Sequence, residues 1–148
     1  MSMKKKLIAC LMTLVVLVTG AVPFASAAAD PGIELYGYNY ALASVYLNIS
    51  SSGKAVIEVQ SYGKANYIDR TSIVVYLEKK SGSSWTRVNI GTTGNQWSYS
   101  TASTNLTTQF THQLTSKGTY RAVCKFTYTG SYPGHTNESV TRTATDTY

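Results

Sequence analysis

The sequence is poor in the residues and motifs that carry out catalysis. It has only two histidines, His112 and His135, and its acidic residues stand singly. It contains no nucleophile elbow, no HExxH motif and no paired-cysteine metal spacing. Isolated acids form neither the carboxylate pair of a glycosidase nor a calcium loop. We therefore expect no catalytic residue, no metal site and no cofactor, and we expect the protein not to be an enzyme.

Long apolar runs are also scarce, and the one that exists lies at the N-terminus. Three lysines at positions 4–6 precede an apolar run at 7–18, and Ala25-Ser26-Ala27 ends the segment in a small-x-small pattern. This order is typical of a secretory signal peptide cleaved after Ala27, and Pro23 argues against the alternative of a permanent membrane anchor. The sequence predicts a signal peptide at 1–27, a flexible lead at 28–35 and one domain at 36–148. The product would be secreted and extracellular, or loosely associated with the cell wall, with no stable membrane insertion.

Removal of the signal changes the counts of charge and of cysteine. The whole chain has 13 Lys and Arg against 7 Asp and Glu, and loss of the three N-terminal lysines leaves 10 against 7, a net charge of +3. These charges are scattered, so we expect no nucleic-acid partner and only a weak attraction to an anionic wall or mucus. Cys10 leaves with the signal and Cys124 remains alone, so no internal disulfide is expected.

The remainder of the chain shows alternation of apolar and polar residues, with Gly, Ser and Asn turns about every ten residues. Such alternation is typical of β-strands, and no window shows helical spacing over several turns. Seven or eight strands are predicted, near residues 40–50, 54–62, 71–79, 85–90, 97–101, 107–115, 119–129 and 135–145. Ile57 and Val59, Ile73 and Val75 would face the core from their strands. This pattern predicts an all-β antiparallel sandwich.

Local features favour an immunoglobulin-like or fibronectin-like sandwich. Tyr120 follows Gly118 at the start of a long penultimate strand, which fits a tyrosine corner whose phenol bonds to upstream backbone. Cys124 and Phe126 share the inward phase of Tyr120, so we interpret Cys124 as a buried, inert thiol rather than a nucleophile or an intermolecular bridge. Trp85 begins the strand after a tight polar turn and would cap one end of the core.

Four segments of the sequence form an ordered pattern. They are LNISSSGKA at 47–55, VVYLEKKSGSSWTRV at 74–88, LTSKGTYRAV at 114–123 and NESVT at 137–141. The pattern resembles a group of small secreted proteins of Gram-positive bacteria, especially gut clostridia, whose function is unknown. The resemblance implies a single small β-sandwich and covers residues 45–141, but it implies no activity.

Tyrosines at two-residue spacing open the predicted domain. Tyr36, Tyr38, Tyr40 and Tyr46 would all lie on the outer face if Ala43 and Val45 face the core. Rings on an outer face stack on sugars or on a partner's side chains, and Tyr76 also points outward from its strand. Two other interpretations stay open. A bulge at Gly37 would bury one or two rings, or the rings would pair across neighbouring strands and stiffen the sheet.

His112 shares its phase with Phe110 and Leu114 and is expected to be half-buried, whereas His135 follows a Gly/Pro turn and is expected to be solvated. Taken together, the sequence predicts a secreted, non-catalytic β-sandwich that binds an extracellular polymer or protein. A cell-wall or host polysaccharide and a surface protein are the expected partners. A self-associating structural protein of the matrix or surface is the first alternative, since an edge strand lined with Tyr and Leu42 would pair with a neighbouring copy. An unrecognised secreted enzyme is the second.

Overall fold

The computed structural model describes residues 34–35, 39–130 and 137–148; of residues 34 and 35 only the backbone is described. This part of the chain is all-β apart from one 3₁₀ turn, η1 (Thr93–Asn95). No helix in it is long and apolar enough to cross a membrane. The strands are β1 (Glu34–Leu35), β2 (Tyr40–Ile49), β3 (Lys54–Gly63), β4 (Ile68–Ser81), β5 (Ser84–Arg87), β6 (Trp97–Thr101), β7 (Asn105–Gln113), β8 (Thr119–Gly130) and β9 (Glu138–Thr147).

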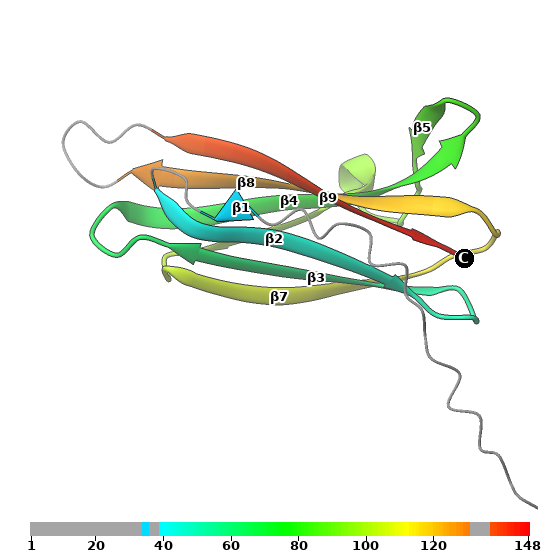
Figure 1. The fold of residues 1–148 in the computed structure, drawn as a ribbon, viewed down its shortest axis with the longest axis horizontal. Coiled ribbons are helices and arrows are strands. Elements are labelled where there is room, and N and C mark those ends of the chain that lie inside the picture. The colour runs from blue at the N-terminus through cyan, green and yellow to red at the C-terminus, as the bar shows by residue number, and fades with distance from the viewer. Residues whose placement is uncertain (1–33, 36–38, 131–136) are drawn as a thin grey trace, which may run out of the picture.

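The strands form two antiparallel sheets that pack face to face (Figure 1). One sheet has the order β1-β2-β3-β7. The other has the order β5-β4-β8-β9, with β6 also paired to β4. The prediction of an all-β antiparallel fold is confirmed, with eight longer strands besides the two-residue β1. β1 falls within the segment 28–35 that the sequence assigns to a flexible lead, and it pairs with Leu42 and Ala43 of β2.

The core lies between the two sheets and follows the alternation that the sequence shows. Ile57 and Val59 of β3 meet Ile73 and Val75 of β4 in one continuous cluster, and these side chains are buried. β-branched side chains suit such strands because they pack well on a pleated surface. A polar pair also lies inside: the hydroxyls of Ser61 and Tyr128 are 2.7 Å apart. Burial raises the pKa of the Tyr128 hydroxyl, against the smaller opposing effect of this hydrogen bond.

Side chains of β9 close one long side of the sandwich. At one end the Glu138 carboxylate accepts the backbone N–H of Asn39 at 2.7 Å. At the other end the Asp146 carboxylate accepts the backbone N–H of Ile49, also at 2.7 Å. β2 and β9 belong to different sheets, so these bonds join the sheets where no ladder does. We call this side the β2–β9 seam.

The opposite long side is closed by aromatic packing. Trp97 of β6 stacks on Phe110 of β7 with ring centroids 5.4 Å apart. These strands also belong to different sheets, so the stack joins the layers across from the β2–β9 seam. Toward the end of the molecule that holds β5 and the C-terminus, the two sheets diverge as β5 extends away from the sandwich (Figure 1).

Two predictions about inward-facing residues are confirmed. The Tyr120 hydroxyl donates to the backbone carbonyl of Ser116 at 2.6 Å, which is the bond expected of a tyrosine corner. Cys124 is buried and free, with Phe126 in the same phase. Burial raises the pKa of the Cys124 thiol, which favours the inert thiol over a nucleophile.

Two other predictions are wrong. Tyr40 was expected on the outer face, but it is only 2% exposed and stacks on Tyr128 with centroids 4.9 Å apart. The reason is a bulge between Tyr40 and Leu42, which shifts the alternation by one residue and turns Tyr40 inward. Trp85 was expected to cap the core, but it lies outside the core cluster. It packs instead beneath the Arg121 guanidinium, whose carbon is 4.4 Å from the ring centroid.

Candidate functional site

The tyrosines predicted to form one binding face are not brought together in the described part of the chain. Tyr36 and Tyr38 lie outside the described residues, as does His135. Tyr40 is in the core. Tyr46 is half-buried on the outer face of the β1-β2-β3-β7 sheet, opposite Glu58, whereas Tyr76 belongs to the other sheet. Tyr76 is covered by the Arg87 guanidinium, whose carbon lies 3.7 Å from the ring centroid.

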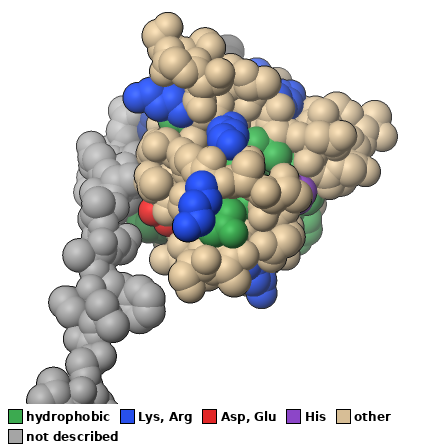
Figure 2. Space-filling model, turned by 90° about the vertical axis from the view of Figure 1, so that its right-hand side faces the viewer, with side chains coloured by type: hydrophobic (Ala, Val, Ile, Leu, Met, Phe, Trp, Pro, Cys, Tyr) green, Lys and Arg blue, Asp and Glu red, His purple; other side chains and the backbone are tan. Residues whose placement is uncertain are grey.

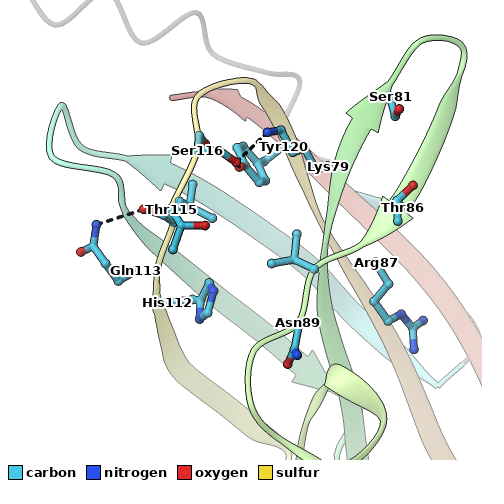
Figure 3. Close-up of a pocket in the computed structure, with 12 residues that line it drawn as sticks. Lys79, Ser81, Thr86, Arg87, Asn89, His112, Gln113, Thr115, Ser116 and Tyr120 are labelled. Carbon is cyan, nitrogen blue, oxygen red and sulfur yellow. Dashed lines mark hydrogen bonds between the residues drawn. The ribbon is translucent and has the colours of Figure 1, made fainter.

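A cleft of about 510 Å³ opens instead at the end of the sandwich where the sheets diverge. One wall is the β4–β5 hairpin with the segment after it, and the other is the end of β7 with the connection to β8 (Figure 3). The lining residues are Lys79, Ser81, Thr86, Arg87, Val88, Asn89, His112, Gln113, Leu114, Thr115, Ser116 and Tyr120. We call this site the β5–β7 cleft.

The tyrosine corner builds the β7–β8 wall of the β5–β7 cleft. Because the Tyr120 hydroxyl holds the Ser116 carbonyl, the connection before β8 is fixed against the core. The Lys79 ammonium donates to the Ser116 hydroxyl at 2.7 Å and lies 5.6 Å from the centroid of the Tyr120 ring. Gly118 makes this approach possible, since a Cβ there would lie 2.8 Å from Lys79 Cε. Lys79 is thus held at the cleft by the Ser116 hydroxyl and the Tyr120 ring (Figure 3).

The β5 wall of the β5–β7 cleft is ordered by its own backbone and by one stacked arginine. The Val88 N–H donates to the Leu77 carbonyl at 2.9 Å, which ties the segment after β5 to β4. The Asn89 side chain accepts the backbone N–H of Gly91 at 2.9 Å and so shapes the next turn. Arg87 lies at the rim, and its side chain points away from Lys79 and Ser116 (Figure 3), with its guanidinium plane on Tyr76 at the outer face of β4. Stacking leaves the edges of that plane available for hydrogen bonds.

His112 belongs to the β7 wall of the cleft. It is half-buried, as the sequence predicts. Gln113, the next residue, points to the other side of β7 (Figure 3), where its side chain donates to the Ser52 carbonyl at 2.8 Å. Val88 and Leu114 add apolar surface to the lining. The cleft therefore combines a largely apolar lining surface with a few hydroxyl, amide, imidazole and cationic groups, a combination that is common in ligand sites.

Sequence reasoning did not find this cleft. Its residues come from 79–89 and 112–120, which meet only in the folded chain. Alternation placed His112 correctly on its strand, but no local signal shows that this strand faces the β5 hairpin. The one available signal was the tyrosine corner, which marks where the β7–β8 connection is anchored.

Comparisons with known proteins were negative: no protein-family model, no curated protein and no solved structure matches this chain. The resemblance to small secreted clostridial proteins therefore stays a prediction. Within residues 39–130 and 137–148, no group of three His, Cys, Asp or Glu side chains is placed to hold a metal ion.

Proposed function

We propose that this protein is a secreted, non-catalytic binding module that holds an extracellular polysaccharide in the β5–β7 cleft. The observation that carries the proposal is the cleft itself. It has about 510 Å³ of space, it is lined by donors and acceptors from two walls, and one wall is fixed by a buried tyrosine. Volumes in this range accommodate small ligands or a few sugar units of a longer chain.

The strand order supports an immunoglobulin-like or fibronectin-like architecture for the module. In such sandwiches strands A, B and E share one sheet, and C, F and G share the other. Assigning A, B and E to β2, β3 and β7, and C, F and G to β4, β8 and β9, reproduces that division. The tyrosine corner near the start of β8 falls at the place where these domains carry it. Binding by such domains in general is an analogy of fold, so the cleft carries the functional argument.

The proposal predicts that filling the cleft weakens binding strongly. Thr115 is exposed and lines the cleft, so Thr115→Trp would occupy it with a large side chain at little cost to the core. The measurement is retention of purified protein on a panel of polysaccharides: cellulose, chitin, peptidoglycan, dextran, mucin glycans and polygalacturonate. We expect the wild-type protein to be retained by at least one polymer and Thr115→Trp to lose at least about tenfold in affinity, the equivalent of one or two lost contacts.

The matched control is Thr111→Trp. Thr111 is also an exposed threonine of the same segment, but it does not line the cleft. Both variants should unfold at the same denaturant concentration as the wild-type protein, and Thr111→Trp should bind normally. Equal binding by the two variants, or no retention of the wild-type protein on any polymer, would refute the β5–β7 cleft as the binding site.

A further inference from the structure

The charged groups that line the β5–β7 cleft have one sign. Lys79 and Arg87 belong to the lining, which contains no Asp or Glu. Three further lysines are exposed on the segments that border this end of the sandwich: Lys54 begins β3, Lys80 lies in the β4–β5 hairpin and Lys117 follows Ser116. Figure 2 shows this end, with several Lys and Arg side chains across it and very little acidic surface.

Most acidic side chains of the described residues are already engaged. The described side chains include ten Lys and Arg against five Asp and Glu, a surplus of five positive charges. Glu138 and Asp146 accept backbone N–H groups in the β2–β9 seam. Glu78 faces Arg87 in the β4–β5 register, but it accepts from Arg121 at 2.6 Å. Few carboxylate groups of the described residues therefore remain to neutralise the positive charges around the cleft.

Lys79 and Arg87 are held in place without a carboxylate. Among the described residues no carboxylate is paired with Lys79 or Arg87, and Glu78, which faces Arg87 across the ladder, is paired with Arg121. Lys79 contacts a hydroxyl and a ring, and Arg87 contacts a ring and, at 3.4 Å, the Gly94 carbonyl. Neutral contacts of this kind order a cation and leave its charge available for an anionic group.

We propose that the ligand of the cleft is an acidic polysaccharide, whose carboxylate or sulfate groups bind Lys79 in the cleft and Arg87 outside its rim while its sugar hydroxyls bind the polar lining. This inference rests on the proposed function and narrows its ligand class. A polymer fits better than a small anion because the cations continue from the cleft onto Lys54, Lys80 and Lys117. A polysaccharide that crosses the cleft would contact several of these cations at once, and the affinities of the individually weak contacts would combine.

The test compares polymers that differ only in charge. Binding of purified protein is measured by affinity electrophoresis with polygalacturonate against its methyl ester, and with dextran sulfate against dextran. We expect both neutral polymers to bind at least about tenfold more weakly than their acidic partners, as for the loss of two surface ion pairs. Comparing polygalacturonate with dextran sulfate shows whether the protein prefers carboxylate or sulfate groups. A preference for either anion supports the proposal. Polyglutamate, an acidic polymer without sugar, should bind more weakly than both.

Charge variants locate the effect. The double variant Lys79→Gln/Arg87→Gln should lose about tenfold in affinity for the acidic polymer. The matched double variant Arg70→Gln/Lys125→Gln removes the same two residue types outside the cleft and should bind almost normally. The double variant Lys79→Arg/Arg87→Lys keeps both positive charges, so it should retain most of the affinity that the double Gln variant loses.

The outcomes separate this inference from the proposed function. Equal affinity for neutral and acidic polymers, while Thr115→Trp still weakens binding strongly, would overturn the acidic ligand and leave the cleft as a site for neutral sugars. Equal affinity for polyglutamate would overturn the sugar specificity. If Thr115→Trp binds as well as the wild-type protein, both proposals fail together.

Discussion

Replacing Tyr40 by alanine is expected to lower the free energy of unfolding by about 3–5 kcal/mol, the range for truncating a large aromatic core residue. The ring is buried, stacks on Tyr128 and receives a hydrogen bond of 3.3 Å from Arg142 to its hydroxyl. Chemical denaturation followed by tryptophan fluorescence measures the change. Tyr40→Phe keeps the ring, so its loss should be only about 1 kcal/mol.

The control for Tyr40 is a tyrosine of the neighbouring strand that points the other way. Tyr62 of β3 is 42% exposed, and Tyr62→Ala should cost less than about 1 kcal/mol, the value of a cross-strand pair. If Tyr40→Ala were as mild as Tyr62→Ala, Tyr40 would lie on the surface. The outward ladder of tyrosines would then have to be reconsidered as a binding face.

Removing both carboxylates of the β2–β9 seam is the second change with a large expected effect. Glu138 accepts the backbone N–H of Asn39, just before β2, and Asp146 accepts that of Ile49 at the end of β2, each at 2.7 Å. A hydrogen bond to a charged group is worth about 1.5–3 kcal/mol, so Glu138→Ala/Asp146→Ala should lose about 3–6 kcal/mol of unfolding free energy. The two sites are eight residues apart on one strand, roughly 26 Å, so the single effects should add.

Glu58→Ala is the matched control for the seam. Glu58 is exposed, and the Gln109 side-chain amide donates to its carboxylate at 3.4 Å. Its removal should change the unfolding free energy by about 0.5 kcal/mol or less, as for most surface substitutions. A loss below 1 kcal/mol in the double variant would mean that the two sheets are joined along this side by apolar packing rather than by the carboxylates.

The strand phases were predictable wherever alternation is regular. β3 alternates over its whole length, and β4 and β8 alternate around Ile73 and Cys124, so Ile57, Ile73 and Cys124 were placed inward from the sequence alone, and they are buried. Register shifts interrupt the pairing of β2 with β3 near Tyr40 and that of β4 with β8 between Ile68 and Arg70. The bulge beside Tyr40 results from backbone pairing with β3, and the local sequence before it gives no sign of where the extra residue falls.

The candidate site was less predictable than the fold for a related reason. Trp85 has the apolar ring of a core residue, but its strand β5 belongs to a hairpin that leaves the sandwich, so the ring packs on Arg121 instead. Lys79 and Ser116 are 37 residues apart and meet only because the β4–β5 hairpin and the β7–β8 connection occupy the same end. Sequence pattern reports the face of a strand, not which end of the molecule a turn shares with another turn.

The central claim is that ligands bind in the β5–β7 cleft, and a chemical-shift titration tests it most directly. Amide resonances of the ¹⁵N-labelled protein are followed while trigalacturonate is added. The account predicts the largest shifts in residues 79–89 and 112–120, which line the cleft. The contrary result is a set of shifts confined to the end of β3 and the β3–β4 turn, where Tyr62 and Tyr67 are 42% and 41% exposed, with the cleft residues unchanged. That result would move the binding site to the aromatic side chains near the opposite end of β4.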